Sequence, residues 1–316
     1  MTITAKSQVL TIGESMLALR ADSAINLGPI FNSSIAGAES NVAIGLSRLG
    51  HRVSWAGLVG SDPHGDLIRR TLYAERVDFL GGVDPNHPTG IMLTEPRLST
   101  TTRVTYQRSS SAGSKLQFSD VEKLLTRDLL LIHLTGITPA LSDTAAECIE
   151  MVIDRAKQVG VKVSFDINFR SKLWSESKAR GTLSNMVSRA DIVIGSPGEL
   201  ELIGQGSAQD IALKLLADSA EWVAVKNGAD GAIVYHGENA TSVSAHKVLI
   251  ADTVGAGDAF TAGFLSGYLD SLTPEAAAKR GVACAAFSIS SRGDWEGLPT
   301  RQDLELLDLE PGGTER

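Results

Sequence analysis

The chain has 316 residues, of which 43% are hydrophobic and 21% are charged, a composition typical of a globular protein with a sizeable core. Its formal net charge of −8 argues against general binding to nucleic acids or anionic membranes. No apolar run approaches the length of a membrane span, and the two cysteines lie in alanine-rich helical patterns. Residues 1–8 are polar and lack a secretory pattern, so we expect a cytoplasmic protein.

Apolar, β-rich runs alternate with amphipathic segments along most of the chain. This alternation predicts an α/β fold with a mostly parallel central sheet flanked by helices on both faces. The expected strands are Val9–Ile12, Val53–Val59, Leu129–Leu134, Val161–Ile167, Asp191–Ile194, Trp222–Lys226 and Ala232–Tyr235. The expected helices are Ser40–Leu49, Asp66–Glu75, Asp143–Val159, Lys178–Ala190, Gln209–Ala217, Ala259–Leu269 and Pro274–Ser290. Ligands of such sheets bind beyond the carboxyl ends of the strands.

Two segments interrupt this alternation. Residues 89–114 predict strands without a helix, at Gly90–Leu93 and Thr102–Gln107, around a polar turn at Pro96–Thr101. Together with residues 15–35, they are expected to form a small β lid over one edge of the main layer. Residues 1–308 would then form one domain. The polar tail at 309–316 is expected to be frayed.

The most informative motif is Asp252–Asp258, a glycine-rich turn that ends in a carboxylate and precedes a helical run. Glycines let several backbone N–H groups point inward, and a helix N-terminus adds partial positive charge. Gly255, Ala256 and Gly257 would therefore suit a phosphate, with Asp258 placed to accept a proton from an attacking hydroxyl. An ordinary capped helix has the same residues, so the motif alone leaves both interpretations open.

Four further clusters place polar or small residues at the ends of predicted elements. They are Ala36–Asn41, Tyr106–Arg108, Asp166–Arg170 and Lys226–Gly231. Taken alone, each also has a plain structural interpretation: a helix start, an exposed strand, a solvent-exposed loop and a hairpin turn, respectively. The sequence contains no P-loop, no Rossmann glycine pattern and no paired-cysteine zinc spacing, which excludes the commonest nucleotide and metal motifs.

Together and in this order, the clusters resemble the ribokinase-like (PfkB) carbohydrate kinase family over essentially the whole chain. One family signature matches residues 37–65 and a second matches residues 252–263. Within the family the chain is most similar to the 2-keto-3-deoxygluconate kinases, through Tyr106-x-Arg108, Asp166–Arg170 and Ser291–Asp294 among other stretches.

The resemblance implies an ATP- and Mg²⁺-dependent kinase that converts 2-keto-3-deoxy-D-gluconate into 2-keto-3-deoxy-6-phosphogluconate. Asp258 would be the general base, and the backbone of Gly255–Asp258 would hold the transferring phosphoryl group. A sugar acid also presents a carboxylate, which arginine binds well, so Arg108 and Arg170 are its expected partners. Gly37, Asn41, Tyr106, Gln107 and Asp294 would line the same pocket.

The expected ATP site lies on the other side of Asp258. It comprises Asn168, Phe169, Arg170, Ser196, Lys226, Asn227, Gly228, Ala229, Asp230 and Gly231, with Gly255, Ala256 and Gly257. Glu199 would bind Mg²⁺ through water, although Ser196 stands where the family has asparagine. A monovalent cation near Asp252 and a homo-oligomer are further expectations.

Two alternatives stay open at this stage. One is a fructokinase or another sugar kinase of the same family, and the other is a catalytically inactive sugar-binding regulator. The sequence also leaves open whether the C4 epimer, 2-keto-3-deoxygalactonate, is accepted.

Overall fold

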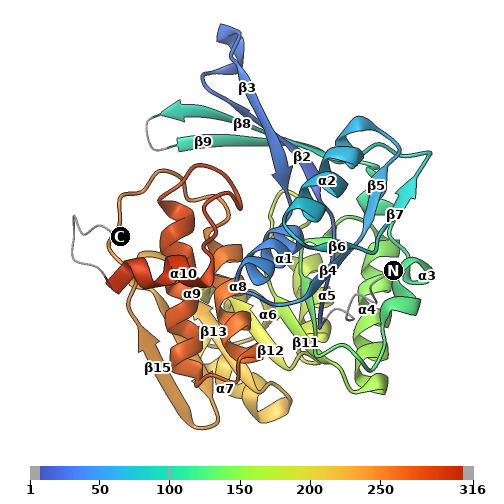
Figure 1. The fold of residues 1–316 in the computed structure, drawn as a ribbon. Coiled ribbons are helices and arrows are strands. Elements are labelled where there is room, and N and C mark those ends of the chain that lie inside the picture. The colour runs from blue at the N-terminus through green and yellow to red at the C-terminus, as the bar shows by residue number, and fades with distance from the viewer. Residues whose placement is uncertain (1–7, 99–100, 309–316) are drawn as a thin grey trace.

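The fold is described from a computed structural model that covers residues 8–98 and 101–308, so the frayed tail expected at 309–316 lies outside the described residues. A large sheet runs through the molecule with helices on both sides, and a smaller sheet projects from one end (Figure 1). In spatial order, the large sheet consists of β15 (Asn239–Val243), β14 (Ala232–His236), β13 (Trp222–Lys226), β12 (Ile192–Gly195), β11 (Lys162–Asp166), β10 (Leu131–Thr135), β1 (Val9–Ile12), β4 (Val53–Ala56) and β6 (Asp78–Phe79).

Strands β13 through β6 of this sheet are parallel, whereas β14 and β15 add an antiparallel edge. All four residues of β1 and of β12 are buried, as expected for parallel strands covered on both faces. The carboxyl ends of the parallel strands therefore meet at one edge of the sheet, where residues after β1, β10 and β11 come together.

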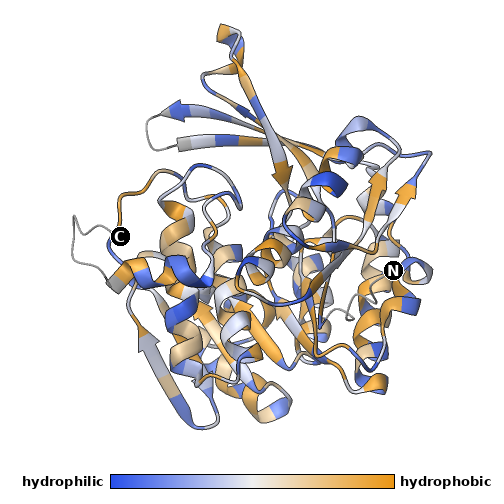
Figure 2. Cartoon of the chain, in the orientation of Figure 1, coloured by the Kyte–Doolittle hydropathy of each residue, from blue (hydrophilic) through white to orange (hydrophobic). Residues whose placement is uncertain are grey.

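Helices cover the two faces in two groups (Figure 1). One face carries α3 (Phe118–Val121), α4 (Asp143–Val159), α5 (Glu176–Val187), α6 (Pro197–Ile203) and α7 (Ala208–Asp218). The other carries α1 (Ala38–Arg48), α2 (Pro63–Ala74), α8 (Ala256–Leu269), α9 (Pro274–Ile289) and, at its margin, α10 (Arg301–Leu304). Hydrophobic residues are concentrated in the central strands and the helices that cover them (Figure 2), and Phe165 and Trp55 are fully buried in the two resulting cores.

The smaller sheet has the order β3 (Phe31–Ala36), β2 (Met16–Ala21), β8 (Ile91–Leu98) and β9 (Thr101–Gln107). It is formed by the segments expected to make a β lid, and we call it the lid. Met16, Ala18 and Met92 form a small apolar cluster on its inner face, with Tyr106 packed against them. Only Gly13, Glu14 and Ser15 connect the central strand β1 to the lid strand β2.

Two sequence predictions were wrong in detail. The strand expected at Val53–Val59 is two strands, because β5 (Leu58–Gly60) leaves the sheet after Gly57 and pairs with β7 (Gly82–Asp84). The turn expected at Pro96–Thr101 is wrong at both ends, because β8 continues through Pro96 to Leu98 and β9 begins at Thr101. Pairing between β8 and β2 ends at Thr94, so the missing N–H of Pro96 removes no bond to β2.

The short helix α6 and the edge strand β15 were not predicted. Within residues 8–98 and 101–308, no helix is both long and apolar enough to cross a membrane.

Candidate active site

A cavity of about 340 Å³ lies between the lid and the carboxyl edge of the large sheet. Its volume falls within the range of small-molecule sites. The lid contributes Met16, Met92, Val104, Tyr106 and Arg108, and the body contributes Glu14, Gly37, Asn41, Ile137, Phe169, Arg170, Gly255, Asp258 and Asp294. The cavity is therefore built by segments that are far apart in the sequence.

Helix α8 begins three residues earlier than the sequence suggested, at Ala256 instead of Ala259. Gly255 is its N-cap, with a left-handed φ of 79°, and a Cβ at this position would overlap the backbone of Asp294. The N–H groups of Ala256, Gly257 and Asp258 belong to the first turn, where N–H groups lack acceptors within a helix. That of Ala256 makes a long bond of 3.4 Å to the carbonyl oxygen of Thr253 in the preceding turn. The earlier start thus gives the predicted anion-binding residues the geometry of a helix N-terminus.

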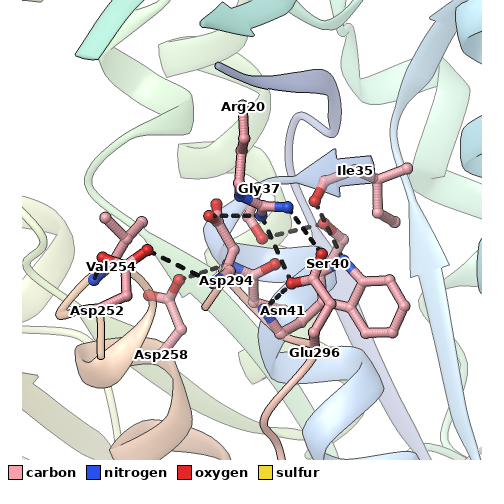
Figure 3. A network of polar contacts seen from close by, with 12 residues as sticks. Arg20, Ile35, Gly37, Ser40, Asn41, Asp252, Val254, Asp258, Asp294 and Glu296 are labelled. Atoms are coloured by element: carbon pink, nitrogen blue, oxygen red, sulfur yellow. Dashed lines mark hydrogen bonds and ion pairs between the residues drawn. The ribbon is translucent and has the colours of Figure 1, made fainter. Parts of the chain in front are cut away.

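The carboxylate of Asp258 lies at the centre of the candidate site. Oδ2 of Asp258 accepts a hydrogen bond of 2.8 Å from Nδ2 of Asn41 (Figure 3). Burial raises the pKa of Asp258, the bond from Asn41 lowers it and the nearby Asp166 raises it, so that the pKa stands above its usual value. A carboxylate with a raised pKa is a better proton acceptor than a solvated one.

The two arginines predicted to bind a carboxylate line the same cavity. Arg108 follows β9 and lies over the ring of Tyr106, with Cζ 5.5 Å from the ring centroid, and it forms an ion pair with the buried carboxylate of Glu14. Arg170 follows β11 and is exposed; its Nη1 donates to the carbonyl oxygen of Phe169.

Asp294 forms an ion pair with an arginine of the lid. Nη2 of Arg20, on β2, lies 3.0 Å from Oδ1 of Asp294, and Nη1 lies 2.8 Å from Oε1 of Glu296 (Figure 3). Asp294 is 4% exposed, and burial raises its pKa to about 6 despite the bond from Arg20. These ion pairs connect the lid to the segment after α9 directly beside Asp258.

Lys226, the last residue of β13, lies beside the N-terminus of α8 but does not line the cavity. Its Nζ lies 3.0 and 2.7 Å from the two carboxylate oxygens of Asp166, and Oγ1 of Thr261 donates to the same carboxylate over 2.9 Å. Burial alone would lower the pKa of Lys226, but Asp166 and Glu199 raise it above its usual value. A Cβ on Gly257 would lie 3.5 Å from this Nζ, so the ammonium stands close to the candidate anion-binding turn.

Glu199 starts helix α6 by accepting two backbone hydrogen bonds. Oε1 accepts from the N–H of Phe169 over 2.8 Å, and Oε2 accepts from that of Ser196 over 2.7 Å. Each oxygen keeps a further lone pair, and Mg²⁺ binds through one or two carboxylates while retaining several waters. The described part of the chain has no group of three or more metal-ligating side chains. Glu199 therefore fits a contact to Mg²⁺ through water and not a cage of protein ligands.

The structure separates the predicted site residues into two groups. Gly37, Asn41, Tyr106, Arg108, Phe169, Arg170, Gly255, Asp258 and Asp294 line the cavity. The others lie outside its lining: Gln107, Asn168, Ser196, Lys226, Asn227, Gly228, Ala229, Asp230, Gly231, Ala256 and Gly257. Gln107 is exposed because successive strand residues point to opposite faces, and Tyr106 and Arg108 point inward. Residues 227–231 connect β13 to β14 as a hairpin, the plain interpretation of that cluster.

Sequence reasoning assigned no role to four charged residues in or beside this site. Glu39 and Asp166 lie within the clusters Ala36–Asn41 and Asp166–Arg170, but they act, like Glu14 and Arg20, as partners of other side chains. Their signal was a charge within or next to a short apolar run, which usually marks a paired or functional group.

The parallel sheet, the β lid and the aspartate at a glycine-capped helix start define a sugar kinase of the ribokinase-like fold. The chain belongs to the PfkB family of carbohydrate kinases, whose family model matches residues 6–301. The family and fold expected from the sequence are thus confirmed, and the protein is a carbohydrate kinase.

Named relatives refine this assignment. The chain is 36% identical to 2-dehydro-3-deoxygluconokinase of Bacillus subtilis strain 168, over 95% of this chain and 94% of that protein. It is 29% identical to 2-dehydro-3-deoxygalactonokinase of Haloferax volcanii, over 91% of this chain and 92% of that protein. Fructokinase of Vibrio cholerae O395, solved with fructose, ADP and calcium, is 30% identical with a TM-score of 0.82, over 95% of this chain and 98% of that one. The chain is thus similar over nearly its whole length to a kinase named for 2-dehydro-3-deoxygluconate and to kinases named for two other sugars.

Proposed function

We propose that the protein transfers the γ-phosphoryl group of ATP to the terminal hydroxyl of 2-keto-3-deoxy-D-gluconate, giving the 6-phosphate and ADP. The observation that carries the proposal is the presence of Arg108, Arg170 and Asp258 in one cavity. A cationic group can hold the acid while the carboxylate of Asp258 meets the hydroxyl at the helix start. The 36% identity to a kinase named for this substrate supports the same choice.

The proposed reaction uses Asp258 as the general base. Asp258 accepts the hydroxyl proton while the hydroxyl oxygen bonds to the γ-phosphorus, and the bond from that phosphorus to the bridging oxygen of ADP breaks. The N–H groups of the first turn of α8 stabilise the charge on the phosphoryl oxygens, and Lys226 adds an ammonium beside them. Mg²⁺, held through water by Glu199, would neutralise phosphate charge when it is bound.

A kinase for neutral sugars is the second candidate function, and the 30% identity to a fructokinase favours it. A neutral sugar offers no carboxylate to Arg170, which is exposed in the cavity and makes one hydrogen bond to a backbone oxygen. Coupled measurement of ADP release separates the two functions. We expect turnover with 2-keto-3-deoxygluconate, and its C4 epimer should be tested in parallel. Equal turnover of fructose would contradict the acid assignment.

We also propose a homo-oligomer. The lid presents the apolar side chains of Leu27 and Ile30, which are 73% and 71% exposed, next to the edge strand β3. Unpaired strand edges with apolar neighbours favour association. Light scattering after size exclusion measures the mass directly, and a monomeric mass at micromolar concentration would refute the proposal.

A further inference from the structure

Glu14 is a buried carboxylate in the connection between β1 and the lid strand β2, and it lies in the wall of the cavity. Glu14 is only 2% exposed to solvent. Two glycines make room for it, because a Cβ on Gly90 would lie 3.0 Å from Oε1 of Glu14 and a Cβ on Gly113 would lie 2.9 Å from Cδ. The surrounding backbone is thus shaped to hold this side chain in one place.

Both carboxylate oxygens of Glu14 have partners in the segment that follows β9. Oε1 accepts a hydrogen bond from Oγ of Ser111, and Oε2 forms an ion pair with Nη2 of Arg108 but no hydrogen bond among the described residues. The N–H of Ser111 also donates to the carbonyl oxygen of Arg108 over 3.1 Å, which closes a tight turn. Glu14 therefore fixes the side chain of Arg108 and the backbone turn after it.

This ion pair leaves another edge of the Arg108 guanidinium unused. The Arg108 side chain is only 10% exposed, and its Nε has no hydrogen-bond partner among the residues that the structure describes. A buried guanidinium N–H without an acceptor is costly. A carboxylate in the cavity would supply the acceptor, and the ring of Tyr106 limits the directions from which it can approach.

The pair also sets the charge of the cavity. Glu14 offsets the charge of Arg108, so among the described residues Arg170 and Lys172 are the cations of the cavity wall without a carboxylate partner, and both are exposed. These two cations can balance the single charge of a sugar acid without a net charge at Arg108. Loss of Glu14 would add Arg108 as a third uncompensated cation and would favour a dianion, whose second charge otherwise lies next to Asp258 and Asp294.

We infer that Glu14 is a positioning and specificity-determining residue, which presents Arg108 to the carboxylate of a sugar acid and excludes more highly charged anions such as phosphate. The inference rests on the proposed sugar-acid substrate for its first half. The second half, the exclusion of phosphate, is measured by binding alone and does not require turnover of a sugar acid. The two halves can therefore be tested separately.

The test compares Glu14→Gln and Glu14→Asp with wild type, using the KM for 2-keto-3-deoxygluconate and calorimetric titration with inorganic phosphate. For Glu14→Gln we expect the dissociation constant for phosphate to fall about tenfold relative to the KM for the acid, with kcat within about threefold of wild type. Glu14→Asp keeps the charge but shortens the side chain. It should raise the KM about tenfold while phosphate binds as weakly as to wild type.

Glu95→Gln is the matched control, because Glu95 is 4% exposed and pairs with Arg103 in the lid but does not line the cavity. A folded Glu14→Gln protein with phosphate binding and KM both within about twofold of wild type would overturn the inference. If Glu14→Gln does not fold, the test rests on Glu14→Asp, and a KM of Glu14→Asp equal to that of wild type overturns the inference. Absence of sugar-acid turnover in wild type would refute the proposed function, whereas the phosphate titration would still judge Glu14.

Discussion

Asn41 and Asp258 connect the first turns of two helices through the 2.8 Å bond from Nδ2 to Oδ2. The helices α1 and α8 pack closely on the same face of the sheet, and a Cβ on Gly45 would lie 2.6 Å from Cβ of Ala262. The orientation of the candidate base is therefore set by helix packing and not by a loop. Rigid elements position reacting groups more accurately than loops do.

Replacing the candidate base tests the centre of the mechanism. Asp258→Asn should lower kcat by about 10²–10⁴-fold, because the amide cannot accept the hydroxyl proton. ATP binding should be little changed, because the first-turn N–H groups remain. Coupled ADP release gives the rate and calorimetry gives the affinity for ATP. Near-normal turnover in this variant would rule out Asp258 as the base.

The two arginines should differ in how their loss affects stability. Arg170→Ala and Arg108→Ala should each raise the KM for a sugar acid about ten- to a hundredfold, as expected for a lost charged hydrogen bond. Arg108→Ala should also lower the melting temperature, because it leaves the buried Glu14 unpaired. Arg170 is exposed, so Arg170→Ala should leave the melting temperature unchanged. The exposed Arg103 on β9 provides the control variant, Arg103→Ala, whose KM should stay at the wild-type value.

Gly255 and Gly257 provide a matched pair in the turn before α8. Gly255→Ala should destabilise the protein by more than about 1 kcal/mol and reduce kcat, because φ is 79° and the added methyl group overlaps the backbone of Asp294. Gly257→Ala meets only an ordinary contact, 3.5 Å from Nζ of Lys226, and should fold normally. Thermal melting separates them, and equal stability of both variants would contradict this account.

Lys226 is expected to matter more than a lysine at the opposite edge of the sheet. Lys226→Met leaves the buried Asp166 without its cation and should cost about 3–5 kcal/mol, together with a loss of kcat. Lys162 pairs with Asp191 at the amino end of β11, and its side chain is 42% exposed. Lys162→Met should therefore cost no more than about 1 kcal/mol and leave turnover intact. Urea unfolding measures the loss of stability in each variant, and similar losses for Lys226→Met and Lys162→Met would refute the distinction.

Glu39 predicts a pH dependence of stability. Oε1 of this buried carboxyl accepts bonds from Thr135 and Thr138, and burial raises its pKa from 4.5 to about 7. The folded state binds the proton more tightly than the unfolded state, so this contribution is fully present below pH 4.5 and is lost as the pH rises through about 7. Glu39→Gln keeps the acceptor without the charge.

We expect Glu39→Gln to melt at a higher temperature than wild type at about pH 8, and the difference to shrink at about pH 5. The exposed Glu147, on α4, supplies the control, Glu147→Gln, which should follow wild type at both values. A difference between Glu39→Gln and wild type that does not change with pH would show that ionisation of Glu39 is not responsible.

The sequence predicted the architecture well because buried parallel strands are nearly continuous apolar runs. Val9–Ile12 and Trp222–Lys226 have the predicted bounds for that reason. It failed at Gly57, where the chain leaves the sheet and a Cβ would overlap the carbonyl oxygen of Gly13 and the ring of Trp55, a close approach that hydrophobicity does not report. It also failed at α6, because Pro197–Ile203 is too short for a helical period to be visible.

The motif residues of the site were predictable, whereas their partners were not. Asp258 and Arg108 belong to patterns that carry chemistry, and the structure brings both to one cavity. Glu14 and Arg20 acquire their roles only when the lid folds back over the sheet and brings Arg108 and Asp294 to them. Pairings between distant residues of this kind depend on tertiary structure and leave no local pattern.

The short connection of Gly13, Glu14 and Ser15 between β1 and β2 has a mechanical consequence. The chain passes from the buried centre of the sheet into the lid within these residues, so they act as the pivot of any swing of the lid. Displacement is small at a pivot and grows with distance from it. Opening would thus carry the far ends of the lid strands, and Arg20 with them, away from Asp294, while Arg108 beside Glu14 hardly moves. Substrate would enter by the side of Asp294 and reach an acid-binding end that is already in place.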